Sequence, residues 1–227
     1  MIKNLINLLF PRLCSGCNSI LLQNEGAICI KCRHEIPITN HHLIPENETL
    51  KKFYGRLPLE YASSFFYYHK EGIVQQLIHH LKYKGRQEIG ELLGNWYFTE
   101  IKDLTILKTV TEIIPVPLHK KRLQERGYNQ LTTFGKALAA GFEIPYNETI
   151  LLRKYYSKTQ TKKTIFSRTE IGTELFEVHF TEKDHGKHFL LIDDVITSGA
   201  TLEACGKMLL KIPNASLSIL AIGYTHS

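Results

Sequence analysis

The chain has 227 residues, 43% of them hydrophobic and 22% charged, so it is long enough to bury a full core and is not expected to be disordered as a whole. Its formal net charge of +6 favours an anionic partner, such as a phosphate-rich small molecule, nucleic acid or acidic lipid. The length predicts one principal domain and a small appendage. No stretch approaches the ~20 apolar residues of a membrane span, which predicts a cytoplasmic protein.

The N-terminus is predicted to form a short amphipathic helix packed on the domain. Lys3, Asn4 and Asn7 interrupt the apolar run that a signal peptide would need. The apolar residues share one helical face: Ile2, Leu5, Ile6, Leu9 and Phe10.

Four of the five cysteines form two pairs, CSGC at 14–17 and CIKC at 29–32, with eleven residues between them. Two such pairs facing each other make a tetrahedral four-sulfur site suited to zinc. Two disulfides are disfavoured in the cytoplasm, and four unlinked thiols are disfavoured by the paired spacing. We predict a structural Zn²⁺ held by Cys14, Cys17, Cys29 and Cys32, with no open position for chemistry. Cys205, the fifth cysteine, is predicted to be buried packing.

Residues 33–60 hold three prolines among polar residues and are predicted to be a linker or an irregular lobe. The predicted domains are therefore 1–58, with the helix, the zinc ribbon and the linker, and 59–227. The second domain is predicted to begin with a strand and two helices, at 61–69, 72–83 and 87–101. Trp96 is assigned to its core.

Strands and helices alternate in the rest of the chain. The predicted strands are 111–117, which runs into a loop, and 149–154, 174–180, 188–193 and 216–225; the predicted helices are 129–140 and 200–211. This alternation is typical of an α/β fold in which a largely parallel sheet has helices on both faces. Ligands of such sheets bind beyond the carboxyl ends of the strands, where Asp193 and Asp194 stand.

The stretch FLLIDDVITSGAT at 189–201 runs four apolar residues into two adjacent aspartates and then into a turn of small residues. Two neighbouring carboxylates in a partly buried place are costly unless cations or hydrogen-bond donors meet them. The turn lies at a predicted helix N-terminus and offers free amides and hydroxyls to a phosphate group. A phosphorylated ribose would satisfy both features. The alternative is that the aspartates only cap the helix, for which one acid would be enough.

Residues 189–201 resemble the phosphoribosyl-diphosphate signature of the type I phosphoribosyltransferases over all thirteen positions. The resemblance implies the parallel-sheet fold of those proteins and a ligand of phosphoribosyl diphosphate with Mg²⁺. It implies that Asp193 and Asp194 contact the ribose hydroxyls. The residues implied to hold the 5′-phosphate and its surroundings are Val195, Thr197, Ser198, Gly199, Ala200 and Thr201.

Further motifs narrow the resemblance to the ComF family, named for competence for DNA uptake. They are the four-cysteine ribbon, LKYKGRQEIGELL at 81–93, PVPLHKKRLQERGYNQ at 115–130 and SKTQT at 157–161. Ile171 stands where the family pattern has asparagine. The resemblance implies a diphosphate-binding loop at 116–126 with Pro117, Arg122 and Arg126. It also implies a closing loop that begins at Arg153 and Lys154, which join Asp193 and Asp194 as catalytic candidates.

Positive charge is concentrated at 118–168, where eleven lysines and arginines stand against three glutamates. The forked donors of Arg122, Arg126 and Arg153 match phosphate oxygens. Basic residues interleaved with aromatic ones also suit single-stranded DNA. The candidates for DNA contact are Lys82, Lys84, Arg86, Lys120, Lys121, Tyr128, Lys158, Lys162 and Lys163.

Two functions stay open at this point. In one, the protein binds phosphoribosyl diphosphate, with or without transfer to an acceptor, and serves DNA uptake or DNA processing. In the other, it is a single-stranded-DNA-binding accessory protein that retains the ribose-phosphate pocket as a regulatory or vestigial site. The ComF resemblance implies a helicase-like competence protein as a further partner.

Overall fold

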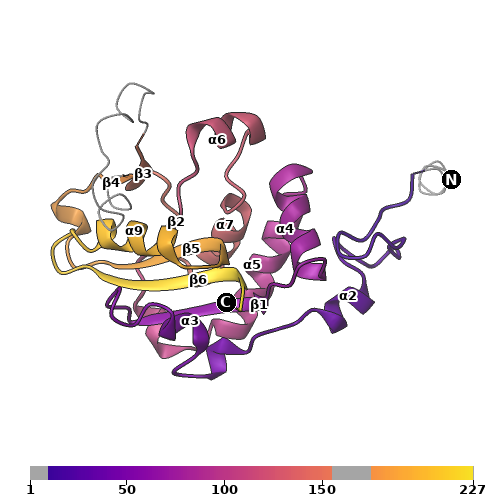
Figure 1. The fold of residues 1–227 in the computed structure, drawn as a ribbon, viewed down its shortest axis with the longest axis horizontal. Coiled ribbons are helices and arrows are strands. Elements are labelled where there is room, and N and C mark those ends of the chain that lie inside the picture. The colour runs from indigo at the N-terminus through magenta and orange to yellow at the C-terminus, as the bar shows by residue number, and fades with distance from the viewer. Residues whose placement is uncertain (1–9, 155–174, 227) are drawn as a thin grey trace.

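The computed structural model of the protein describes residues 10–154 and 175–226. Its centre is a four-stranded sheet in which every neighbouring pair is parallel (Figure 1). The strand order is β1-β6-β5-β2, with β1 at Tyr61–Tyr67, β6 at Ser216–Tyr224, β5 at His188–Ile196 and β2 at Glu112–Pro115. The predicted α/β fold with a parallel sheet is confirmed.

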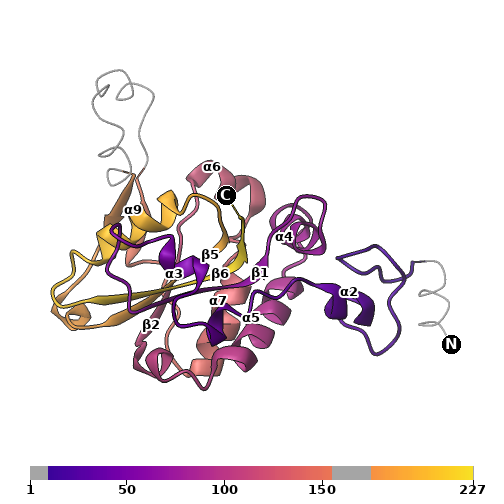
Figure 2. The ribbon, with the colours of Figure 1, turned by 60° about the horizontal axis from the view of Figure 1, so that its bottom comes forward.

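Helices cover both faces of the sheet (Figure 2). A Cβ added at Gly135 of α7, which spans Thr132–Phe142, would lie 2.7 Å from Ile192. A Cβ added at Gly206 of α9, which spans Ala200–Leu209, would lie 2.8 Å from Leu217, the ladder partner of Phe189. Because successive residues of a strand point to opposite faces, Ile192 and Phe189 lie on different faces. The helices α7 and α9 therefore pack on opposite sides of β5.

Two more helices share the α7 side of the sheet. α4, at Ile73–Tyr83, buries one stripe of apolar residues at helical spacing: Val74, Leu77, Ile78 and Leu81. α5, at Glu88–Ile101, packs against α7 and stacks Tyr97 on Phe65 of β1, with ring centroids 4.4 Å apart. Trp96, predicted to lie in the core, is half-buried and packs edge-on against Phe65.

The strands predicted at 149–154 and 174–180 do not join the parallel sheet. They form a separate antiparallel pair, β3 at Leu151–Arg153 and β4 at Phe176–Val178. The reason lies at the outer edge of β2, where Ile113 exchanges hydrogen bonds with Pro145 and Asn147. With its outer hydrogen-bonding groups already satisfied, β2 offers β3 no edge to join. The short pair packs instead against α9.

The segment predicted to be a linker folds against β1. It contains the short helices η1 at His41–Leu43 and α3 at Glu48–Lys51, and its start overlaps α2 at Ile30–Glu35, which begins within the second cysteine pair. The amide of Thr39 donates to the carbonyl of Phe65, and the Asn47 side-chain amide donates to the carbonyl of Ala62. Phe53, itself part of this segment, is fully buried. The division of the chain after residue 58 stays a prediction.

Three short elements complete the described chain: η2 at Thr105–Thr109, α6 at Lys120–Arg126 and η3 at Glu182–Asp184. Within 10–154 and 175–226, none of the helices has the length and apolar character needed to cross a membrane.

Candidate functional site

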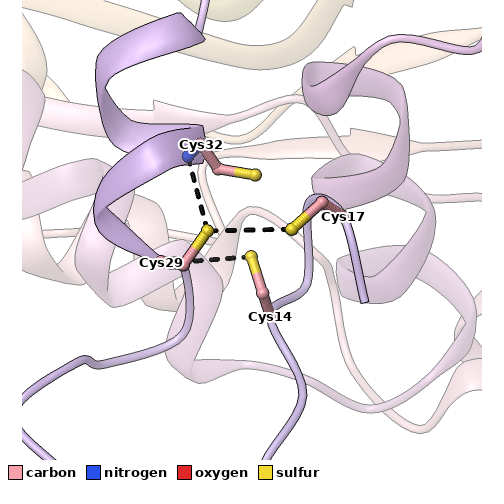
Figure 3. A group of neighbouring side chains, drawn as sticks. All are labelled: Cys14, Cys17, Cys29 and Cys32. Carbon is pink, nitrogen blue, oxygen red and sulfur yellow. Dashed lines mark hydrogen bonds between the residues drawn. The ribbon is translucent and has the colours of Figure 1, made fainter. Parts of the chain in front are cut away.

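The four N-terminal cysteines come together in one cluster (Figure 3). Their sulfur atoms all lie within 4.8 Å of one another, and Cys17 Sγ is 3.7 Å from Cys29 Sγ. Ligands of a tetrahedral zinc, each about 2.3 Å from the metal, lie about 3.8 Å apart. The four thiols are not linked by disulfides. The cluster can therefore hold a metal ion such as zinc.

The local chain is shaped for this cluster. The amides of Gly16 and Cys29 donate to Cys14 Sγ, and the amide of Cys32 donates to Cys29 Sγ. A Cβ at Gly16 would lie 2.9 Å from Cys32 Sγ, so the first turn needs glycine. Hydrogen bonds with Ser19 lower the pKa of the Cys17 thiol to about 6. A thiolate at neutral pH is the form that binds a metal.

The acid pair lies within β5 rather than after it, because the strand continues to Ile196. Asp193 and Asp194 therefore point to opposite faces of the sheet. Asp194, on the α7 face, is buried and accepts two hydrogen bonds, from Lys82 Nζ at 2.6 Å and from Gln130 Nε2 at 2.5 Å. These two hydrogen bonds offset the desolvation cost of burying the Asp194 carboxylate.

Asp193 points to the α9 face and makes no ion pair with a lysine or arginine among residues 10–154 and 175–226. Its Oδ1 accepts a hydrogen bond from the backbone N–H of Asp194 at 2.8 Å. Burial, together with the neighbouring charge of Asp194, raises the pKa of Asp193 well above its usual range. Cys205 lies on α9, fully buried as predicted.

Neither aspartate caps the helix that follows, so the capping alternative is wrong. The N-cap of α9 is Gly199, in the left-handed conformation with φ +74°, and the side chain that bonds to the first turn is Ser198, whose Oγ accepts from the Ala200 amide at 3.4 Å. Thr197, Ser198, Ala200 and Thr201 are exposed, and Val195 is half-buried. The turn is thus open on its outer side.

Two cations missed by the sequence analysis bind the carbonyl side of this turn. Lys52 Nζ donates to the carbonyl of Thr197 at 2.5 Å, and Arg56 Nη1 donates to the carbonyl of Ser198 at 2.8 Å. Both belong to the segment predicted to be a linker. Lys52 and Thr197 are 145 positions apart in the sequence, and Arg56 and Ser198 are 142 positions apart. Such distant residues share no local sequence pattern, so no sequence signal could have paired them.

The predicted diphosphate arginines face a basic hollow between α4 and α6. Arg122 and Arg126 line this hollow of about 310 Å³ with Lys82, Tyr83, Gly85, Glu125 and Tyr128. Arg126 also bonds to Gln130 Oε1. A hydrogen-bonded chain therefore runs from Arg126 through Gln130 to Asp194 and Lys82. Gln130, like Lys52 and Arg56, was not among the predicted site residues.

Pro117, Arg153 and Lys154 line a different and larger hollow, of about 880 Å³. It lies between the end of β2, the chain before α7 and the β3–β4 pair, and its walls include Asn129 and Glu177. Tyr128 lines both hollows. The structure therefore brings Arg122 and Arg126 to Lys82, but it leaves Arg153 and Lys154 on the far side of Tyr128.

The candidates for DNA contact occupy varied environments. Lys84, Lys120 and Lys121 are exposed, while Arg86 is paired with Glu88. Lys82 is engaged with Asp194. Lys158, Lys162, Lys163 and Ile171, like the SKTQT motif, lie outside the described residues.

Comparison with known proteins shows which proteins this chain is similar to. Residues 132–223 match the family of the phosphoribosyl transferase domain. The chain is 26% identical to the DNA utilization protein YhgH of Shigella flexneri, over 91% of this chain and 88% of that protein. It is 29% identical to competence protein F of Haemophilus influenzae, over 60% and 61%, and 26% identical to competence protein ComFC of Bacillus subtilis, over 88% and 78%. The chain is thus similar to competence and DNA utilization proteins, and it matches the phosphoribosyl transferase domain over 132–223.

Proposed function

We propose that the protein binds phosphoribosyl diphosphate with Mg²⁺ and acts in DNA uptake or DNA processing. The observation that carries the proposal is the junction of β5 and α9. There two acidic residues near the end of a buried strand are followed, after Val195 and Ile196, by an exposed turn at a helix N-terminus. The names of the relatives, DNA utilization protein and competence protein, support the wider role.

In this proposal each part of the ligand has its own partners. The amides and hydroxyls of 197–201 hold the 5′-phosphate. Asp193 and Asp194 accept hydrogen bonds from the ribose hydroxyls, and the diphosphate extends toward Arg122 and Arg126. Bound Mg²⁺ would neutralise part of the diphosphate charge. If a nucleophile attacks the anomeric carbon, the arginines stabilise the charge on the departing diphosphate.

We also propose that the cysteine cluster binds Zn²⁺ as a structural ion. The sulfur separations fit a tetrahedral site, and four protein ligands complete its coordination. Cys14, Cys29 and Cys32 are buried. The metal would stabilise the N-terminal ribbon and take no part in the reaction.

Thermal unfolding with and without ligand tests the binding proposal. At a hundred times its dissociation constant a ligand stabilises the folded state by about 2.7 kcal/mol, which corresponds to a rise in Tm of roughly 5 to 10 °C for a chain of this size. We expect this rise with phosphoribosyl diphosphate and Mg²⁺, and its loss in the Asp193→Asn/Asp194→Asn variant. Mg²⁺ alone is the control. An equal rise in parent and variant would contradict the proposed site.

A second function, the binding of single-stranded DNA, is favoured by the basic hollow. Tyr83 is 67% exposed there and lies beside Lys82, Arg122 and Arg126, so that a ring for base stacking adjoins cations for phosphates. Binding of a fluorescent oligonucleotide that weakens steeply with salt would support it. Turnover of phosphoribosyl diphosphate, with no effect of the oligonucleotide, would favour the first function alone. A helicase-like partner belongs to either proposal.

A further inference from the structure

The turn between β5 and α9 is held from behind by two cations. Lys52 Nζ binds the carbonyl of Thr197, and Arg56 Nη1 binds the carbonyl of Ser198. These are consecutive peptide groups of the turn that would receive the 5′-phosphate. Both cations come from the chain just before β1, outside the region 132–223 that matches the phosphoribosyl transferase domain.

Peptide geometry gives this arrangement a consequence for the amides. In a trans peptide the C=O and N–H of one plane point in opposite directions. When the carbonyl of Thr197 faces Lys52, the amide of Ser198 must face away from Lys52. In the same way the carbonyl of Ser198 on Arg56 turns the amide of Gly199 away from Arg56. Two consecutive amides therefore point to the open side of the turn, as in an anion-binding nest.

The two cations also polarise the groups that they orient. A peptide carbonyl bound to a charged donor makes the N–H of the same peptide a stronger donor, because hydrogen bonds in a chain reinforce one another. The positive charge of Lys52 lies one peptide away from the amide of Ser198 and adds to the field of the α9 N-terminus, whereas the charge of Arg56 is offset by Glu203. Both effects favour an anion on the open side.

The cations are themselves held in place. Lys52 Nζ lies 4.8 Å from the centroid of the Tyr224 ring, at the end of β6. Arg56 makes a two-nitrogen contact with Glu203 of α9, with Nε at 2.8 Å and Nη2 at 2.5 Å from the same oxygen. Between them Phe53 packs beneath the turn, where a Cβ added at Gly199 would lie 3.0 Å from its ring. The segment 52–56 therefore holds the turn through several side chains that are themselves fixed by contacts with β6 and α9.

We propose that Lys52 and Arg56 are positioning residues that pre-arrange the 5′-phosphate turn, so that the site needs the chain before β1 as well as the phosphoribosyl transferase domain. This inference rests on the proposed function. It assigns to the N-terminal segment a role in ligand binding that the prediction of a linker did not include.

Calorimetry with two partial ligands tests the proposal. Ribose 5-phosphate carries the 5′-phosphate, and pyrophosphate represents the other end of the proposed ligand. We expect Lys52→Met and Arg56→Gln each to weaken ribose 5-phosphate binding about tenfold, the loss expected when a charge-assisted contact is removed, and to change pyrophosphate binding less than about twofold. Lys52→Arg should recover most of the affinity, because it retains the charged donor.

Lys51→Met is the matched control, since Lys51 is the exposed neighbour of Lys52 at the end of α3. A second measurement needs no ligand. In ¹⁵N–¹H spectra the Ser198 and Gly199 amide resonances should move in the Lys52 and Arg56 variants and stay in place in the control. Unmoved resonances, or ribose 5-phosphate affinity equal to that of the parent, would overturn the positioning role alone. A parent that binds neither partial ligand would overturn the proposed function, and this inference with it.

Discussion

Replacing Lys82 by methionine should destabilise the protein through Asp194. The Lys82 ammonium lies 2.6 Å from Asp194 Oδ1, and the two side chains are 23% and 10% exposed. Methionine keeps most of the aliphatic stem of lysine and removes only the charge. Within the described part of the chain, the carboxylate is then left with one neutral side-chain donor, Gln130 Nε2 at 2.5 Å.

The size of the effect follows from the burial of the pair. Removing one partner of a fully buried ion pair costs about 3–5 kcal/mol, whereas an exposed pair contributes about 0–1 kcal/mol. The Lys82–Asp194 pair is mostly buried on the carboxylate side, so we expect a loss of about 2–3 kcal/mol in the free energy of unfolding. For a chain of this length this lowers Tm by roughly 5 to 10 °C.

A double-mutant cycle isolates the interaction. Unfolding of the parent, Lys82→Met, Asp194→Asn and the double variant should give a coupling energy of about 1–3 kcal/mol. Lys84→Met, an exposed lysine just beyond the end of α4, is the control and should change Tm by less than 2 °C or so. A coupling energy near zero, or equal effects of the Lys82 and Lys84 variants, would refute the account of how Asp194 is neutralised.

Three further predictions concern the acid pair, the cysteines and the arginines. Burial raises the pKa of Asp193, so the folded state keeps a proton that the unfolded chain loses near pH 4. This contribution to stability falls as pH rises through the raised pKa. The Tm of Asp193→Asn should therefore rise relative to that of the parent between pH 5 and pH 8, and a constant difference in Tm would contradict the raised pKa. Cys14→Ser, or treatment with a strong chelator, should lower Tm and remove bound zinc measured by mass spectrometry; unchanged Tm together with no zinc in the parent would exclude the metal site. Arg122→Ala and Arg126→Ala should each weaken pyrophosphate binding about tenfold in calorimetry, and affinities equal to the parent's would exclude these arginines from the diphosphate site.

The elements that could be predicted from the sequence are those with a local pattern. The strands β5 and β6 are buried apolar runs, and α4 has a regular apolar stripe. α6 lay within the segment predicted to be a loop, because none of its seven residues is buried and it has no apolar periodicity to detect. β3 was assigned to the parallel sheet because nothing in its own residues shows that 145–147 already occupies the edge of β2.

The residues of the candidate site also divide into those with a local sequence pattern and those without one. The cysteine spacing and the signature at 189–201 are local, so their residues could be named from the sequence. The residues that neutralise and orient the site come from distant parts of the chain. Lys82 and Gln130 lie 112 and 64 positions from Asp194, and Lys52 lies 145 positions from Thr197. The packing of α4, the chain just before α7 and the segment before β1 around the sheet brings them to the site.

Calorimetric titration of phosphoribosyl diphosphate with Mg²⁺ tests the central claim most directly. The parent and the Asp193→Asn/Asp194→Asn variant should be compared after circular dichroism and zinc content show that both are folded. The account predicts micromolar binding to the parent, about 8 kcal/mol, which pyrophosphate displaces and which the variant lacks. Absence of heat with the parent, together with no competition by pyrophosphate, would contradict the account.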